Sequence, residues 1–333
     1  MLQKVLLFFL LNTLCPAAEL ELVQVKKVWN LARHNAFTDL INHKDVWYSV
    51  FREGNEHIPG SNGIIRIIRS TDDEVWESAA VISENGVDLR DPKISIMPDG
   101  RFMLLIGGAI YENPDSPQRR KLVLHRTRVS FSKDGIEWTA PQPISIPAMN
   151  WLWRISWNKD AGYGFSYTTG VPLNKMALTL WRTDDGINYT KISSPQLPTN
   201  CYPNEATIRF LSDDSMVALV RNENHSGPAY IGLSKPPYND WRFISAGKPV
   251  QGPNFIVLPD GIMVYSGRDF TPSAQTVVGF MTLEKCTPEV VLPSKGDTSY
   301  PGMVWYKDYL WISYYSTHED KTSIYLAKLK LKK

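Results

Sequence analysis

The sequence predicts an all-β protein, a six-bladed β-propeller whose blades are four-stranded antiparallel sheets, and three observations support this fold class. Polar heptads of the form Ser/Thr-x-Asp-Gly/Asp-x-x-Trp/Tyr recur along the chain. Six segments have the pattern of β-hairpins, and helical periodicity is almost missing. Repeats of about 50 residues with this content are typical of propellers and solenoids built from four-stranded units.

The heptads are the first sign of repetition. "STDDEVW", "SKDGIEW" and "TDDGINY" begin at Ser70, Ser132 and Thr183, and a degenerate copy, "SKPPYNDW", begins at Ser234. In such a turn the Asp accepts hydrogen bonds from backbone N–H groups, the Gly tolerates a positive φ, and the aromatic residue packs between neighbouring sheets. We expect the heptads to join the third and fourth strands of a blade, on the outer side of the ring.

The hairpins give the number of blades. Each has alternating apolar residues on both sides of an Asp, Gly or Lys turn. They cover residues 34–54, 88–108, 150–170, 203–223, 252–270 and 299–320. After the sixth hairpin only "SIYLAKLKL" (323–331) remains, so the last blade lacks an outer strand. We expect "ELVQVKKVW" (21–29) to supply it and close the ring, which removes exposed sheet edges.

The N-terminus has the form of a secretory signal. Lys4 precedes an apolar run from Val5 to Leu11, and small residues, Ala17 and Ala18, come before Glu19. The apolar run is too short to span a membrane. We expect residues 1–18 to be a signal peptide cleaved near Ala18, residues 19–333 to form one propeller domain, and the protein to be secreted or periplasmic. A lipoprotein anchored through Cys15 and a buried N-terminal strand are the alternatives.

Charge and cysteine content exclude several classes of protein. The formal net charge is +2, which argues against a nucleic acid or an anionic membrane as partner. Cleavage would leave Cys201 and Cys286; one disulfide is formally possible, but the strand pattern places them on an inner and an outer strand, so we expect two free thiols. No Cys/His cluster has the spacing of metal ligands. We expect no metal, no cofactor and a monomer.

Functional residues should gather at one rim of the ring. In an antiparallel hairpin the start of the first strand and the end of the second lie at the same rim. The side chains at these positions are Arg33, His34, Arg52, Glu53, His57, Arg90, Asp91, Trp153, Arg154, Glu205, Arg221, Glu223, Arg268, Asp269, Tyr300, His318, Glu319 and Asp320. Arg52, Arg221 and Arg268 share one position in their hairpins, so they could form a multidentate carboxylate clamp.

The chain resembles the sialidase (neuraminidase) family of propeller glycoside hydrolases with Asp-box repeats. The resemblance rests on "SKDGIEW", "TDDGINY", "NEATIRFLSDDSMVALVRNE", "SGRD" and "SYPGMVWYKDYLWISYYSTHED", and it covers essentially the whole mature chain. It implies hydrolysis of a terminal sialic acid, with Arg52, Arg221 and Arg268 holding the sugar carboxylate. It also implies a Tyr nucleophile activated by a Glu, and Tyr300 and Glu205 match these roles.

A neutral phenol suits this substrate because its anomeric carbon carries a carboxylate, which would repel an anionic nucleophile. Asp91 is the first choice for the general acid, with Glu53 and His57 as alternatives. Arg90, Trp153 and Arg154 are further candidates for substrate contacts. The expected partner is a glycan or glycoconjugate with an acidic terminal sugar. The alternatives are a propeller enzyme that acts on uronate-containing glycans and a non-catalytic glycan-binding propeller.

Overall fold

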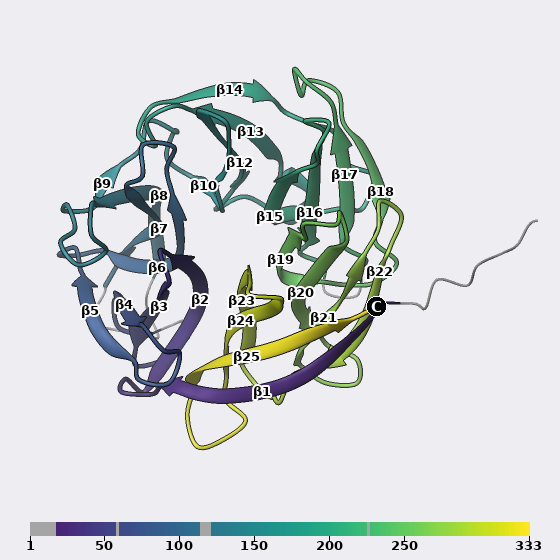
Figure 1. The fold of residues 1–333 in the computed structure, drawn as a ribbon. Coiled ribbons are helices and arrows are strands. Elements are labelled where there is room, and N and C mark those ends of the chain that lie inside the picture. The colour runs from purple at the N-terminus through teal and green to yellow at the C-terminus, as the bar shows by residue number, and fades with distance from the viewer. Residues whose placement is uncertain (1–17, 58–59, 114–120, 225–226) are drawn as a thin grey trace, which may run out of the picture.

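The computed structural model describes residues 18–57, 60–113, 121–224 and 227–333, and shows six β-sheets arranged as blades around a central axis (Figure 1). This confirms the predicted six-bladed propeller. The predicted signal peptide falls almost wholly outside the described residues. Helix within the described chain is one 3-10 turn, Leu173–Lys175. No helix in the described ranges is long and apolar enough to cross a membrane.

Each blade is given from its inner to its outer strand. The first is β2 (His34–His43), β3 (Val46–Gly54), β4 (Ile64–Ser70) and β5 (Glu77–Ile82). The second is β6 (Asp88–Ile96), β7 (Phe102–Glu112), β8 (Lys121–Ser132) and β9 (Gln142–Pro143). The third is β10 (Asn150–Leu152) with β11 (Ser156–Asn158), then β12 (Ala161–Thr168), β13 (Leu178–Thr183) and β14 (Tyr189–Ser193).

The fourth blade is β15 (Pro203–Phe210), β16 (Met216–Asn222), β17 (Tyr230–Ser234) and β18 (Arg242–Ser245). The fifth is β19 (Gln251–Val257), β20 (Met263–Asp269), β21 (Gln275–Met281) and β22 (Cys286–Val291). The sixth is β23 (Thr298–Tyr306), β24 (Tyr309–Ser316), β25 (Ser323–Lys332) and β1 (Glu19–Trp29). β1 pairs with β25 from Glu19↔Lys332 to Trp29↔Ile324, which confirms the expected closure of the ring (Figure 1).

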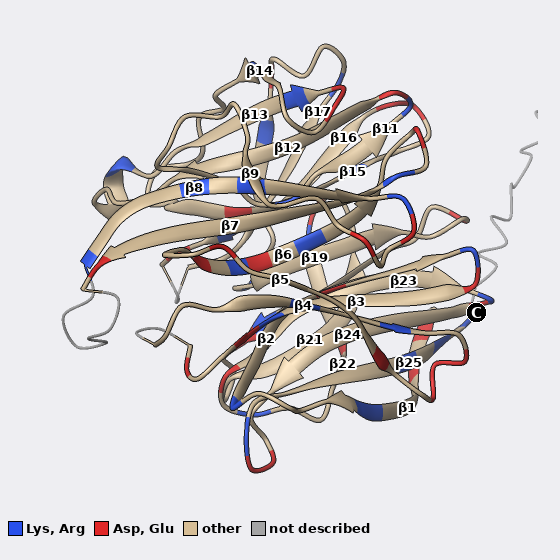
Figure 2. Cartoon of the chain, turned by 90° about the vertical axis from the view of Figure 1, so that its left-hand side faces the viewer, with Lys and Arg blue, Asp and Glu red and all other residues tan. Residues whose placement is uncertain are grey.

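The heptads lie between third and fourth strands, as predicted. In the second blade Asp134 Oδ1 accepts hydrogen bonds from the backbone N–H groups of Ile136 and Glu137, at 2.8 and 2.9 Å. Gly135 has a φ of 76°, and a Cβ there would lie 2.5 Å from a ring carbon of Tyr48 in the first blade. The heptads therefore shape the turn and the contact between adjacent blades. Figure 2 shows acidic and basic residues interspersed on the side in view.

The inner strands share a β-bulge, which changes the direction of nearby side chains. Pairing of each inner strand with the next strand shifts register once in β2, β6, β15, β19 and β23. In the third blade the inner strand is interrupted between β10 and β11. Phe37, Asp91, Gly252 and Tyr300, all at these bulges, have φ between 48° and 64°. Such values are common for glycine but rare for the other three residues. Bulges commonly aim side chains at functional sites.

Contacts between blades hold these bulges in place. Thr38 Oγ1 donates a hydrogen bond of 2.8 Å to the carbonyl of Tyr300, and Thr207 Oγ1 donates one of the same length to the carbonyl of Pro253. Asn254 Nδ2 donates to the carbonyl of Pro301 at 2.9 Å. These buried side chains satisfy backbone carbonyls that the bulges release from strand pairing, so the strained backbone is fixed by its neighbours.

Candidate active site

Tyr300, Glu205 and Arg221 form a compact buried cluster at one rim. Tyr300 Oη donates a hydrogen bond of 2.7 Å to Glu205 Oε1, and Arg221 Nη1 lies 2.7 Å from the same oxygen and 3.1 Å from Tyr300 Oη. The backbone N–H of Gly252 donates to Glu205 Oε2 at 3.0 Å. Both carboxylate oxygens are thus oriented, and the phenol points at a base. The structure brings Tyr300 and Glu205 together, as the sequence suggested.

The electrostatics keep Tyr300 protonated in the free protein. Burial raises the pKa of Tyr300 well above the ordinary tyrosine value, and the negative charge of Glu205 acts in the same direction. The positive charges of Arg221 and Arg268 oppose both effects. The phenol is therefore neutral in the free protein, and the Glu205 carboxylate that accepts its hydrogen bond is the base placed to accept its proton.

Arg268 lies beside the Tyr300 ring, with its guanidinium carbon 5.5 Å from the ring centroid. Its Nε donates to the carbonyl of Thr298 at 2.8 Å, and its Nη2 contacts Asp297 Oδ1 at 3.2 Å and Tyr315 Oη at 2.9 Å. Arg221 in turn forms a 2.9 Å ion pair with Glu223. Both arginines are positioned at the candidate site, and each already has a carboxylate partner.

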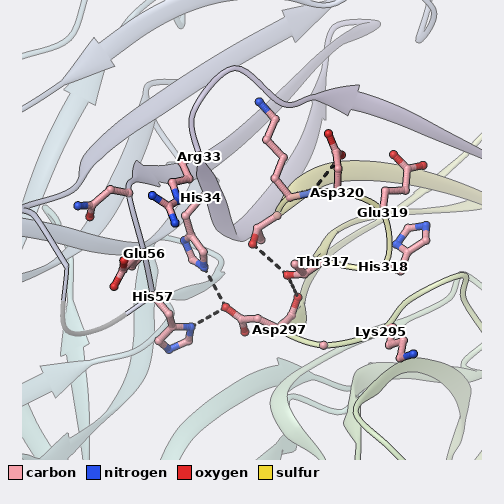
Figure 3. Close-up of a pocket in the computed structure, with 14 residues that line it drawn as sticks. Arg33, His34, Glu56, His57, Lys295, Asp297, Thr317, His318, Glu319 and Asp320 are labelled. Atoms are coloured by element: carbon pink, nitrogen blue, oxygen red, sulfur yellow. Dashed lines mark hydrogen bonds and ion pairs between the residues drawn. The ribbon is translucent and has the colours of Figure 1, made fainter.

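Asp297 links this cluster to a neighbouring cavity of about 640 Å³ between the first and sixth blades. His34 Nε2 and His57 Nδ1 both contact Asp297 Oδ2, at 2.9 and 2.7 Å, and Figure 3 shows the two imidazoles converging on that carboxylate. These three residues are the group of the described chain whose donor atoms lie close enough together to hold a metal ion. Arg268 Nη2 and Tyr315 Oη contact the other oxygen of Asp297, at 3.2 and 2.9 Å, so both carboxylate oxygens take part in a hydrogen-bonded network.

Asp91 has the environment of a general acid. Its side chain is 5 % exposed, and burial raises the pKa of its carboxyl group. The charge of Glu205 raises it further, whereas Arg90 and Lys93 oppose the shift. Arg90 Nε lies 3.7 Å from Asp91 Oδ2 and, in the described chain, has no hydrogen-bond partner. A raised pKa favours the acid form of a carboxyl group, which is the form that can donate a proton to a leaving group.

Arg52 does not belong to this cluster, which corrects the proposed three-arginine clamp. Its side chain is fully buried, and Nε and Nη2 contact Asp88 Oδ1 at 3.1 and 2.9 Å. Nη1 and Nη2 also donate to the carbonyls of Glu56 and Ser61, both at 3.0 Å. The loop after β3 covers the guanidinium, so its donors are used within the protein and none faces a substrate.

Glu53 is likewise structural. Its two carboxylate oxygens accept hydrogen bonds from Trp29 Nε1, at 2.7 Å, and from Arg66 Nη2, at 2.9 Å. Through these two hydrogen bonds Glu53 joins Trp29 of β1 to Arg66 of the first blade. Glu53 is therefore engaged away from Tyr300 and is not a suitable alternative to Asp91 as general acid. His57, the other alternative, is 41 % exposed and faces the cavity next to the site.

Trp153 and Arg154 lie below the candidate site and not in it. Trp153 is 2 % exposed, and its ring packs edge-on against the Tyr300 ring with the centroids 5.7 Å apart. Arg154 forms a buried ion pair with Asp39 at 2.8 Å. The predicted substrate contacts of these two residues do not fit the structure, because Trp153 is buried against Tyr300 and Lys93 and Arg154 lines a different cavity with Asp39.

Two tyrosines that were not among the predicted site residues lie at the site. Tyr315 contacts Arg268, and Tyr167 feels the charges of Glu205 and Asp91, which together with burial raise its pKa well above the ordinary value. The strand pairing gives a signal by which the sequence could have predicted these two tyrosines. Tyr167 pairs with Trp151, and Tyr315 with Ser299, at the hairpin positions where Arg52 pairs with Ala36 and Arg268 with Gln251. The same rim position thus carries arginine in some blades and tyrosine in others.

Comparison with solved structures places the chain among known propellers by fold. A protein of unknown function from Dyadobacter fermentans DSM 18053 matches with a TM-score of 0.82 and 17 % identity, over 94 % of this chain and 99 % of that one. An α-L-arabinanase from Penicillium chrysogenum, complexed with arabinobiose, matches with a TM-score of 0.66 and 15 % identity, over 92 % and 98 % of the two chains.

A sialidase from Trypanosoma rangeli, in complex with the inhibitor DANA, matches with a TM-score of 0.62 and 11 % identity, over 89 % of this chain and 55 % of that one. No family model matches the sequence, and no curated protein matches it. At these identities the similarity defines the fold class and leaves the chemistry to be argued from the site.

Proposed function

We propose that the protein is a retaining glycoside hydrolase that removes a terminal sugar from a glycan, and that the sugar is a sialic acid. The observation that carries the proposal is the 2.7 Å hydrogen bond from Tyr300 to Glu205, flanked by Arg221 and Arg268. A tyrosine paired with a buried carboxylate is an activated neutral nucleophile, and this nucleophile is the sialidase exception to the two-carboxylate rule of glycosidases.

The mechanism has two steps. Tyr300 Oη attacks the anomeric carbon while Glu205 accepts the phenolic proton, and Asp91 protonates the departing glycosidic oxygen. The bond from sugar to aglycone breaks, and a bond from sugar to Tyr300 forms. In the second step Asp91, now ionised, takes a proton from water as the water oxygen attacks the anomeric carbon. The bond from the sugar to Tyr300 Oη breaks, and Glu205 returns the proton to Tyr300 Oη. The anomeric configuration is retained.

A neutral furanose such as arabinose is the second candidate substrate. Arg221 and Arg268 already contact carboxylates of the protein, and Arg52 is engaged elsewhere, so none of these three arginines is held open for a sugar carboxylate. The arabinanase that shares this fold was solved with arabinobiose. A sialic acid would have to displace Asp297 from Arg268, whereas a neutral sugar would leave the ion pairs intact. A uronide would meet the same obstacle as a sialoside.

The test is hydrolysis of a panel of fluorogenic glycosides: an α-sialoside, an α-L-arabinofuranoside and a β-glucuronide. We expect release from the sialoside, with Tyr300→Phe slower by about a thousandfold, in the range of losses for catalytic groups. Tyr309→Phe, at the other end of the sixth blade, is the matched control and should retain full activity. Mass spectrometry after reaction with a fluorinated sialoside should find the label on Tyr300.

Other outcomes separate the alternatives. Release from the arabinofuranoside alone would replace the sialic acid with a neutral sugar. Release from the glucuronide alone would favour a uronate-active enzyme, and saturable glycan binding without turnover of any substrate would leave a glycan-binding propeller. We also propose that the chain is exported and acts as a monomer. N-terminal sequencing of the protein from the extracellular or periplasmic fraction should give Glu19.

A further inference from the structure

The opposite end of the central axis contains a second cavity, of about 390 Å³. Residues 40–42 of β2, 94–96 of β6 and 303–304 of β23 contribute to its wall. These residues follow the bulges, so the cavity lies on the far side of them from Tyr300. Two arginines and one carboxylate, Arg154, Arg209 and Asp39, also line it. The lining therefore carries two positive charges and one negative charge.

Asp39 is committed to Arg154. Arg154 Nη1 contacts both oxygens of Asp39, at 3.0 and 2.8 Å, and Asp39 Oδ2 also accepts a hydrogen bond from the backbone N–H of Ile94 at 3.0 Å. Arg154 is more than nine-tenths buried, yet its Nε has no hydrogen-bond partner in the described chain. One buried donor of this guanidinium is therefore left for something other than the protein.

Arg209 faces the same cavity with only neutral acceptors. Its Nη1 donates to Ser156 Oγ at 2.9 Å and to its neighbour's carbonyl, that of Ile208, at 2.7 Å, and its Nη2 donates to Asn254 Oδ1 at 2.9 Å. Within the described ranges, no carboxylate lies within 4.0 Å of its guanidinium nitrogens. Burial and the charge of Arg154 lower its pKa to about 9, so at neutral pH it stays charged.

The nearby Lys93 does not relieve this excess. Its ammonium lies 4.6 Å from the centroid of the Trp153 ring and contacts the carbonyl of Pro92 at 3.2 Å. Burial and the positive charge of Arg154 lower the pKa of Lys93 to about 8, and the negative charge of Asp39 opposes this shift. Lys93 does not line the cavity. Among the charged residues that do line it, Arg209 is the one without an ion-pair partner, next to the ion pair of Arg154 with Asp39.

We propose that this cavity binds a small monovalent inorganic anion, such as chloride, between Arg154 and Arg209. A partly buried cation without an ion-pair partner, such as Arg209, loses part of its hydration, and an anion that contacts both guanidinium groups would offset that cost. The lining side chains carry two positive charges and one negative charge, so one bound monovalent anion would balance them. The site is separate from the sugar-binding rim, so it stands whether or not the protein hydrolyses sialosides.

The experiment compares thermal unfolding in sodium chloride and in sodium gluconate at constant ionic strength. General screening is the same in both salts because the ionic strength is constant. Gluconate is too large and too hydrated to occupy a site for a small anion, so it serves as the reference salt. The unfolding midpoint should rise with chloride by roughly 2 to 5 °C and then saturate, as linkage to one site requires. Bromide-soaked crystals should show one anomalous peak within about 3.5 Å of both guanidinium groups, the usual contact range for such ions.

Variants test the residues. Arg209→Gln keeps an amide that can bond Ser156 or Asn254 and should lose the chloride dependence, while in gluconate it should be at least as stable as the wild type. Arg182→Gln, which removes an exposed arginine paired with Asp184, is the control and should respond to chloride like the wild type. Equal midpoints of the wild type in the two salts, or a bromide peak elsewhere only, would overturn the proposal. If Arg209→Gln fails to fold, the wild-type titration and the bromide peak still decide it.

Discussion

Arg52 is a structural residue in this propeller, and its replacement by Met should destabilise the fold without acting on the chemistry. Met fills a similar volume but leaves Asp88, which is fully buried, without its charged partner. The Asp88 carboxylate would retain one hydrogen bond, from the backbone N–H of Gly63. The carbonyls of Glu56 and Ser61 would also lose their donors.

The size of the effect follows from this environment. Breaking a buried ion pair from one side costs about 3–5 kcal/mol, because the remaining charge is left unpaired. At about 2–4 °C per kcal/mol the thermal midpoint should fall by roughly 6 to 20 °C. Removing the second charge should recover much of the loss, so Arg52→Met/Asp88→Asn should be more stable than Arg52→Met alone.

The assay is thermal unfolding followed by circular dichroism, together with turnover per folded molecule on whichever glycoside the wild type cleaves. Arg101→Met, which removes an exposed arginine paired with Asp99, is the control and should shift the midpoint by no more than a degree or two. An Arg52→Met protein with an unchanged midpoint and a greatly raised KM would refute the reasoning and restore Arg52 to a substrate clamp.

Three further predictions follow from other contacts. Asp91→Asn should abolish the alkaline limb of the kcat/KM profile and spare substrates with good leaving groups, because burial raises the pKa of Asp91 and its acid form is the active one; an unchanged profile would exclude Asp91 as the acid. Gly135→Ala should cost about 2 kcal/mol more in urea unfolding than Gly100→Ala, since both need a positive φ but only at Gly135 would a Cβ meet Tyr48; equal costs would contradict the packing described. Despite burial, bonds to His34 and His57 and the charge of Arg268 hold the pKa of Asp297 far below its ordinary value, so its stabilisation is present above about pH 4 and is lost as pH falls further; Asp297→Asn should flatten the acid side of the stability profile, and an equally steep profile would contradict this.

The order of the strands and the location of the site could be predicted from the sequence. Alternation of apolar residues has a period of two, and polar heptads recur between strands, so blade boundaries and strand ends are local properties that the sequence records. Because antiparallel hairpins bring defined strand ends to one rim, the neighbourhood of Tyr300 and Glu205 followed from that order. The closing strand was predictable for the same reason, since the last blade lacked a partner.

The roles of individual arginines were not predictable in this way. Arg52 and Arg268 pair at comparable hairpin positions, whereas Arg221 lies one residue before the comparable position, opposite the bulge of β15, so the predicted shared position of the three arginines is wrong for Arg221. Only the contacts of Arg52 with Asp88 and with the carbonyls of Glu56 and Ser61 decide that Arg52 is structural. Asp297 gave no signal because it lies in a loop before β23 and acquires its partners from two other blades.

The sequence by itself determined the architecture of this protein, because strand alternation and turn chemistry act over a few neighbouring residues. The tertiary structure alone decided which charges face which. It placed Asp91 within electrostatic reach of Tyr300 and Glu205 through bulges that local patterns do not record, and it placed Arg209 and the Arg154–Asp39 ion pair around one cavity. Burial and pairing of charges depend on residues far apart in the chain, so they are properties of the closed ring.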